Sequence, residues 1–519
     1  MIATSAGKVQ GFREDGIAKF LGIPFAEPPT GELRWRPPAP HKAWKGTLQA
    51  TAYAPICAQT NTFGLFAGPA NDNEDCLHLN VFTPDPAPSA RLPVLVWIHG
   101  GGNINGGAPG YDGAKMALKG KIVVVSVQYR LNAMGWFAHP ALDREGHQFA
   151  NYGVLDQQLA FKWVRDNIGR FGGDPGKVTI AGESSGALNV GLNMVSPQAA
   201  GLFHGAICQS LCPGPLLPAG PPISLKTAEE RGVAFAIKAG CGSGVDAETA
   251  RCLRALSAAE VEKIAAAGNF IGSQGIVDGQ VVPILPMTAF RTGKFNHVPL
   301  INGNTQDEQM MFIAIRQYFS AADNALRTPA TAEQYLAYVN GTYGKSPYPA
   351  ETAKAILARY PLKNYPSPAQ ASNRVGSDAA ICGQRILDKV LAPQIPVYAY
   401  EFQDRTAPFY FPKMPGLDQG AYHTSDIQYL FPRWHGGPGA IVIPFNQAQT
   451  ALSDLMVGAW TNFARTGTPG RFGPVEWPRY VDDPSVPVWL LQKMQPMLMS
   501  DADYGRIRNC DLWDEIAKY

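Results

Sequence analysis

The sequence predicts an α/β fold in which a mostly parallel, twisted central sheet is flanked by helices. Short runs of apolar, largely β-branched residues recur along the chain, and stretches with helical periodicity lie between them. The runs are continuously apolar, which is typical of parallel strands buried on both faces. We expect central strands at 94–98, 122–127, 178–181, 205–209, 298–301 and 397–402.

Two helices are expected to cover this sheet. At 154–168 the apolar residues Leu155, Leu159 and Trp163 recur at helical spacing and leave the polar residues on other faces. The stretch 448–466 has a similar apolar stripe and ends before Gly467, a residue that commonly terminates helices. Both stripes are interpreted as core packing.

Two long regions, 213–267 and 312–377, contain no strand-like run and mix helical periodicity with proline and glycine. We expect them to be helical insertions that form the walls of an active-site gorge, because loops and excursions at the edge of a sheet commonly carry function. Internal repeats, low-complexity tracts and linkers are absent from the sequence. The chain is therefore predicted to be a single domain spanning residues 1–519.

Composition excludes several classes of protein. Apolar residues make up 45% of the chain and charged residues 17%, which is typical of a globular protein. The formal net charge is +2 and lysine and arginine form no block, so nucleic acid is not an expected partner. The longest apolar runs are strand-sized, well below the roughly 18 residues of a membrane span. A small-molecule partner is the remaining expectation.

The central motif is the sequence Gly-Glu-Ser-Ser-Gly at 182–186, a GxSxG pattern. It follows the predicted strand 178–181 and precedes a helix-forming stretch, which is the strand, sharp turn and helix of a nucleophile elbow. The two glycines leave room for the strained turn, and the helix start directs backbone amides toward the hydroxyl of Ser184. We interpret Ser184 as a nucleophile; the alternative is a glycine-rich turn without chemistry.

A second glycine run, His99 to Gly102, directly follows the predicted strand 94–98. Backbone amides can approach a substrate oxygen closely where side chains are absent, so this run is typical of an oxyanion hole. The expected donors are the amides of Gly101, Gly102 and Ser185. His99 is interpreted as structural, and the alternative for the whole run is a flexible loop.

A serine hydroxyl needs a general base held by an acid, and in chains with this elbow the order is serine, acid, histidine. Asp307 and Glu308 follow the predicted strand 298–301 and the Asn-Gly-Asn sequence at 302–304, which we interpret as a turn. Spacing does not choose between the two carboxylates. His423 and His435 both follow them, and His423 is favoured because it lies in the loop after strand 397–402.

The sequence resembles the type B carboxylesterases, an α/β-hydrolase family that includes the cholinesterases, over essentially its whole length. Six segments carry this resemblance, the last of which contains the elbow: 20–29, 74–81, 99–102, 129–130, 171–175 and 182–187. The resemblance implies a serine esterase with Ser184 as nucleophile, Glu308 as acid and His423 as base.

The resemblance also assigns supporting residues. Gly101, Gly102 and Ser185 match the oxyanion hole, and Glu183 and Ser210 resemble the family's buried residues behind the triad. Arg34 with Glu74, and Arg130 with Asp156, resemble its structural ion pairs. Neither a metal nor an organic cofactor is implied, and the expected state is a monomer or homodimer.

The chain has eight cysteines without metal-binding spacing. Cys57 with Cys76, and Cys241 with Cys252, bracket short polar segments as loop-closing disulfides do, although eight buried thiols in a cytosolic enzyme are the alternative. The resemblance implies three disulfides, which join Cys57 to Cys76, Cys241 to Cys252 and Cys382 to Cys510. It therefore favours a secreted or periplasmic protein whose signal peptide is absent from this chain, with a cytoplasmic location as the alternative. Cys208 and Cys212 are left open, paired or reduced.

Several positions depart from the family pattern. Asn103 stands where an aromatic residue usually follows the glycines, Ser185 replaces an alanine, and Gln309 replaces a glycine. Leu211 and Cys212 replace Gly-Ser, so the acyl pocket is expected to differ. The short loop between Cys57 and Cys76 has no tryptophan, which counts against choline esters, while its Phe63 and Phe66 are candidates for lining the gorge.

The expected reaction is two-step acyl transfer through an acyl-enzyme on Ser184. The predicted function is a carboxylesterase, with bulky natural-product or xenobiotic esters as the suggested substrates. Two alternatives are kept: a catalytically inactive, cholinesterase-like binding protein, and an amidase, carbamate hydrolase or lipase that uses the same site.

Overall fold

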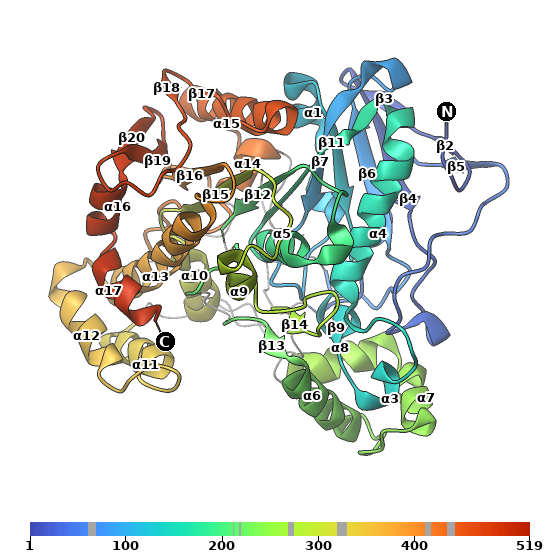
Figure 1. Ribbon diagram of the computed structural model, residues 1–519, viewed down its shortest axis with the longest axis horizontal. Coiled ribbons are helices and arrows are strands. Elements are labelled where there is room, and N and C mark those ends of the chain that lie inside the picture. Colours follow the sequence, from blue (N-terminus) through green and yellow to red (C-terminus); the bar gives the residue numbers. More distant parts are fainter. Residues whose placement is uncertain are drawn as a thin grey trace.

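The fold is built on a sheet of eleven strands (Figure 1). The computed structural model describes residues 1–60, 69–210, 212–216, 220–267, 274–318, 330–409, 417–432 and 442–518. In spatial order the strands are β20 (Met497–Ser500), β19 (Pro487–Gln492), β16 (Val397–Phe402), β15 (Leu300–Thr305), β12 (Gly205–Gln209), β11 (Gly173–Glu183), β7 (Leu92–Ile98), β8 (Val123–Val127), β6 (His78–Thr83), β4 (Ile17–Pro24) and β3 (Phe12–Glu14).

The centre of the sheet is parallel and its edges are antiparallel. Every neighbouring pair from β19 to β8 is parallel, whereas β20, β6, β4 and β3 add antiparallel pairs at the two edges. All six expected strands are present in this centre, and the structure matches the expected bounds of β12 and β16. The mostly parallel α/β sheet predicted from the sequence is thus confirmed.

The expected turn at Asn302, Gly303 and Asn304 is wrong, because these residues continue strand β15. The side chain of Asn302 is buried and donates a hydrogen bond of 2.8 Å to Asp388. A Cβ at Gly303 would lie 2.2 Å from the ring of Tyr400 on the neighbouring strand, so only glycine fits there. Buried partners therefore override the turn preference of the Asn-Gly sequence.

Helices cover both faces of the sheet (Figure 1). One core cluster joins the side chains of Val94, Val96 and Ile98 to helices that include α4 (Tyr152–Asn167) and α5 (Ser185–Val195). The alternate residues Leu95 and Trp97 face a second cluster, to which α1 (Ala114–Gly120) and α15 (Gln447–Thr466) contribute. The helices expected at 154–168 and 448–466 are α4 and α15, and α15 ends at Gly467 in the left-handed conformation, with φ of 78°.

The two expected insertions are mainly helical. The first contains α6 (Leu225–Lys238), α7 (Ala247–Ala255) and α8 (Ala258–Ala267), together with the two-residue strand β13 (Ile223–Ser224), which was not predicted. The second includes the end of α10 (Gln309–Tyr318), α11 (Ala332–Tyr343), α12 (Thr352–Arg359) and the first part of α13 (Pro368–Leu391). In Figure 1 α6, α7 and α8 lie at the lower right of the molecule, and α11 and α12 lie at the lower left.

Short elements complete the described chain. They are β1 (Ile2–Ala3), β2 (Lys8–Gln10), β5 (Thr47–Gln49), α2 (Asn132–Gly135), β9 (Trp136–Phe137), α3 (Pro140–Asp143), β10 (Ala150–Asn151), β14 (Ile276–Val277), α9 (Pro286–Arg291), α14 (Ile427–Leu430), β17 (Arg471–Phe472), β18 (Val475–Glu476), α16 (Asp501–Ile507) and α17 (Cys510–Ile516). Among the helices of the described ranges, none combines the length and the apolar character that crossing a bilayer requires.

Four disulfides link the chain. Three join the expected pairs, Cys57 to Cys76, Cys241 to Cys252 and Cys382 to Cys510. The fourth joins Cys208 to Cys212, the two cysteines whose state the sequence left open. The last of the expected bridges spans 128 residues and ties α13 to α17 near the C-terminus.

Candidate active site

Ser184 occupies a sharp turn between strand and helix at the centre of the sheet. Strand β11 ends at Glu183 and helix α5 begins at Ser185. Ser184 itself has φ of 59° and ψ of −127°, a conformation that costs an ordinary residue of order 1–3 kcal/mol. Its amide donates to the carbonyl of Gln209 at 2.9 Å, which fixes the turn against strand β12. This is the geometry expected of a nucleophile elbow.

The glycines on either side of the turn are required by close packing. A Cβ at Gly186 would lie 2.1 Å from the carbonyl oxygen of Ile98, and a Cβ at Gly182 would lie 2.5 Å from the backbone of Gly186. Side chains at either position would therefore force β7, β11 and α5 apart. The GxSxG pattern is explained by the contact between these elements.

The glycine run follows β7 and lies beside the elbow. A Cβ at Gly100 would be 3.1 Å from the Cβ of Ser184, so the run passes directly against the candidate nucleophile. Gly101 and Gly102 have φ of 109° and 67°, which is left-handed backbone that favours glycine. Within the described residues, the amides of Gly101, Gly102 and Ser185 donate to no backbone carbonyl. These three amides are available to an oxyanion.

Glu308 and Asp307 have different environments. The Glu308 carboxylate accepts hydrogen bonds from the Ser210 hydroxyl at 2.6 Å and the Thr305 amide at 2.8 Å, and contacts Nδ1 of His423 at 2.5 Å. Asp307 instead pairs with Arg405 at 2.6 Å and accepts from the amide of Ala421. The structure therefore brings Glu308, and not Asp307, to His423.

His423 is fully buried, and its two ring nitrogens face two different carboxylates. Nδ1 contacts Glu308, while Nε2 lies 3.3 Å from Oε1 of Glu183, the residue before Ser184. Neither that Nε2 nor that Oε1 has a hydrogen-bond partner among the described residues. The Nε2 atom of His423 thus faces the residue that directly precedes Ser184 in the chain.

The carboxylates set the proton affinity of this centre. Burial alone would lower the pKa of His423, but the charges of Glu183 and Glu308 outweigh it and raise the pKa to about 9. Burial raises the pKa of Glu183 well above its ordinary value. The two facing groups also act on each other: the charge of Glu183 raises the pKa of His423, and the charge of His423 lowers the pKa of Glu183.

Sequence reasoning missed three neighbours of the site. Asp426 is buried three residues after His423 and accepts from the Gln209 side chain at 2.7 Å, and burial raises its pKa to about 6. The Phe312 ring lies 5.0 Å from the imidazole of His423. Gln209 is the last residue of β12, directly before Ser210, and Asp426 lies three residues after His423, so closeness to recognised residues is the signal that could have found them; Phe312 gave no such signal.

His99 has a structural environment. Burial lowers its pKa to about 4, so the ring is neutral near pH 7. Its Nδ1 bonds the carbonyl of Gly100 at 2.8 Å, and the ring stacks on Tyr129 with centroids 4.4 Å apart. The other sequence candidates, His435, Phe63, Phe66 and Leu211, lie outside the described residues.

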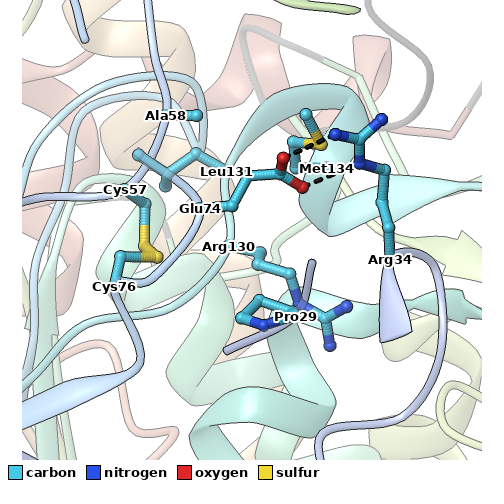
Figure 2. Close-up of a pocket in the computed structure, with 9 residues that line it drawn as sticks. All are labelled: Pro29, Arg34, Cys57, Ala58, Glu74, Cys76, Arg130, Leu131 and Met134. Atoms are coloured by element: carbon cyan, nitrogen blue, oxygen red, sulfur yellow. Dashed lines mark hydrogen bonds and ion pairs between the residues drawn. A yellow bond between two sulfur atoms is a disulfide. The ribbon is translucent and has the colours of Figure 1, made fainter. Parts of the chain in front are cut away.

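Figure 2 shows a small cavity beside the Cys57–Cys76 disulfide, next to which Arg34 and Glu74 face each other. The ion pair has an N–O distance of 2.5 Å, and Arg130, on the cavity wall, pairs with Asp156 at 2.7 Å. The cavity volume is about 10 Å³, enough for one water molecule and far too small for an ester. Both ion pairs are structural.

Comparison with known proteins identifies the family. The model of the carboxylesterase family matches residues 1–504. The chain belongs to the carboxylesterase family. It is 34% identical to a fumonisin B1 esterase from Sphingopyxis macrogoltabida, over 92% of this chain and 84% of that protein. It is 32% identical to the para-nitrobenzyl esterase of Bacillus subtilis, over 93% of both chains. Carboxylesterase 1C of Rattus norvegicus is 33% identical, over 92% of this chain and 88% of the relative.

Membership in the carboxylesterase family explains the sheet and the elbow together. The parallel centre, flanking helices and GxSxG turn are those of an α/β-hydrolase fold. The chain is a carboxylic ester hydrolase, as its relatives are named esterases and carboxylesterases. The roles of individual residues require a separate argument.

Proposed function

We propose that this carboxylesterase hydrolyses esters through an acyl-enzyme on Ser184, with His423 as general base and Glu308 as the acid that orients it. The single observation that supports this most strongly is the 2.5 Å contact between Nδ1 of His423 and Glu308, next to the strained turn at Ser184. An imidazole held at Nδ1 by a carboxylate presents Nε2 for proton transfer.

In the first step the Oγ atom of Ser184 attacks the carbonyl carbon while its proton passes to Nε2 of His423. The carbonyl oxygen becomes an oxyanion that accepts from the amides of Gly101, Gly102 and Ser185, each donor contributing about 3 kcal/mol. The C–O bond then breaks, and His423 gives the proton to the departing alcohol. Water repeats the sequence on the acyl-enzyme, which releases the acid and restores Ser184.

This step requires a small rearrangement. Nε2 of His423 faces Glu183 in the resting geometry, so the serine hydroxyl must turn toward the imidazole when substrate binds. Such tightening on substrate binding is common for catalytic hydrogen bonds.

For substrates, we favour bulky natural-product or xenobiotic esters. Ser184 is 8% exposed and His423 is fully buried, so an ester must enter through a passage that the helical insertions would line as a gorge. Two relatives are named for fumonisin B1 and para-nitrobenzyl substrates. The partner in this proposal is a small-molecule ester, and the enzyme acts as one domain in a monomer or homodimer without a metal or cofactor.

Labelling with an organophosphate tests the nucleophile. A dialkyl phosphoryl group should add to Ser184 and to no other residue, and Ser184→Ala should abolish both labelling and ester hydrolysis. Mass spectrometry of the labelled protein locates the adduct. A different labelled residue, or full esterase activity in the alanine variant, would refute the assignment.

A panel of esters tests the substrate class. It should include small para-nitrophenyl esters, aromatic esters and polycarboxylate esters, compared by kcat/KM. Preference for the bulky members supports the proposal, whereas preference for acetate esters contradicts it. We also propose a secreted or periplasmic location, which four disulfides favour. Fractionation of the native host tests the location.

A further inference from the structure

The Ser185 hydroxyl contacts the loop that carries the oxyanion amides. Oγ of Ser185 accepts a hydrogen bond of 2.9 Å from the amide of Asn103, the residue directly after Gly102. Both residues are buried, Asn103 completely and Ser185 to all but 5% of its surface. Asn103 and Ser185 are two of the positions at which the chain departs from the carboxylesterase pattern, and here they bond to each other.

The next turn of helix α5 also forms hydrogen bonds with Asn103. Asn189 lies four residues after Ser185, so the two side chains share a face of the helix. The amides of Asn103 and Asn189 bond reciprocally: Asn189 donates to Asn103 at 2.8 Å and accepts from it at 3.3 Å. Two successive turns of helix α5 therefore form hydrogen bonds with Asn103, the residue that follows the glycine run.

Other contacts fix both ends of the run. The hydroxyl of Tyr129 donates to the carbonyl of His99 at 2.6 Å and lies 3.3 Å from Oδ1 of Asn103. The carbonyl of Asn103 accepts from the amide of Asn132 at 2.7 Å. The glycines between these ends have no side chains to hold them, so their amides are positioned through His99 and Asn103 and through the backbone bonds that the carbonyl of Gly101 accepts from the amides of Ile104 and Asn105.

Resting on the proposed function, we infer that the Ser185 side chain is a positioning group for the oxyanion hole. The amide of Ser185 is one proposed donor, and the amides of Gly101 and Gly102 are the others. The Ser185 hydroxyl accepts a hydrogen bond from the amide of Asn103. This bond fixes the distance between the start of helix α5, which carries the Ser185 amide, and the glycine run, which carries the other two amides. A hole that is held in this way needs no rearrangement as charge develops on the substrate oxygen.

The variant Ser185→Ala tests this inference because it keeps the backbone amide and removes only the hydroxyl. Loss of one buried hydrogen bond is expected to lower kcat about 5- to 10-fold with little change in KM. Affinity for a trifluoromethyl ketone, which mimics the tetrahedral oxyanion, should fall by a similar factor. Ser185→Thr, which restores a hydroxyl, should return kcat to within about twofold of the parent enzyme.

Ser196→Ala is the matched control. Ser196 caps the other end of α5, is fully buried, and its hydroxyl accepts a single side-chain bond of 2.9 Å from Gln158. The Ser196→Ala variant makes the same chemical change at the opposite end of helix α5, far from the glycine run. Unchanged kcat in this control, together with the loss in Ser185→Ala, supports the positioning role.

A second variant keeps the inference testable if Ser185→Ala does not fold. Asn189→Ala removes the side-chain hydrogen bonds between Asn189 and Asn103, and is expected to lower kcat without raising KM. The inference fails if Ser185→Ala or Asn189→Ala keeps the kcat of the parent enzyme. It also fails if Ser196→Ala lowers kcat as much as Ser185→Ala does. The proposed function fails separately, when organophosphate does not label Ser184 in the parent enzyme.

Discussion

Nε2 of His423 lies 3.3 Å from Oε1 of Glu183, and neither atom has a hydrogen-bond partner among the described residues. Burial raises the pKa of Glu183, and the charge of Glu183 in turn raises the pKa of His423. The contact therefore links the protonation of the proposed base to the residue next to the nucleophile.

The first prediction concerns pH. The proposed base works in its neutral form, and its pKa is raised to about 9, so kcat/KM should rise with pH through the alkaline range. The charge of Glu183 stabilises the imidazolium, so Glu183→Gln should lower the pKa of His423 and move the rising limb to lower pH. Rate profiles of both enzymes measure this shift, and superimposable limbs would show that Glu183 does not act on the base.

The second prediction separates the two adjacent carboxylates. Glu308→Gln leaves the shape intact but removes the charge that orients His423, and should lower kcat about 10³- to 10⁴-fold. Asp307→Asn changes the neighbouring residue in the same way, yet Asp307 contacts Arg405 and not the imidazole, so it should retain most of kcat. Steady-state kinetics of the pair decide the matter; equal losses would exclude Glu308 as the acid.

The centre of the sheet and the position of Ser184 could be predicted because their signals are local. Apolar runs mark β12 and β16, and the GxSxG sequence marks the elbow. The continuation of β15 through Asn302 could not be predicted, because its cause is a bond to Asp388, 86 residues away in the sequence. The choice of Glu308 over Asp307 is of the same kind, since it depends on where Ser210 and His423 are brought by other strands.

The third prediction compares two glycines. A Cβ at Gly186 would lie 2.1 Å from the carbonyl of Ile98, whereas a Cβ at Gly458, on the exposed side of α15, would meet nothing within 4 Å. Gly186→Ala should prevent folding or strongly destabilise the protein. Gly458→Ala should raise the free energy of unfolding by about 0.5–1 kcal/mol. Denaturant melts test both, and a folded, active Gly186→Ala would contradict the packing of the elbow.

The fourth prediction concerns the disulfides. The Cys382–Cys510 bridge closes a loop of 128 residues and the Cys241–Cys252 bridge one of 11. In the loop-entropy description, removing the first should cost about 5 kcal/mol of stability and removing the second about 3 kcal/mol. Double alanine variants of each pair, compared by chemical unfolding, give the difference. An equal cost would show that native-state contacts, and not loop closure, dominate.

The last prediction concerns substrate charge. Arg316 lies four residues after Phe312 on α10, so both side chains share a helix face, and the Phe312 ring contacts the imidazole of His423. The guanidinium lies over the ring of Tyr338, 5.9 Å from its centroid, and forms no ion pair with the described residues. A cation one helical turn from Phe312, the residue that contacts the proposed base, can pair with a carboxylate on the substrate.

Arg316→Gln should therefore raise KM about tenfold for esters that carry a free carboxylate and leave KM for neutral esters of the same size unchanged. Arg471→Gln is the control, because Arg471 is an exposed arginine that faces Glu476 on the β17–β18 hairpin. Added salt should reduce the preference of the parent enzyme for the anionic ester, since screening weakens exposed charge pairs. If Arg316→Gln raises KM equally for neutral and anionic esters, Arg316 shapes the site through packing. Its side chain then does not recognise the charge of the substrate.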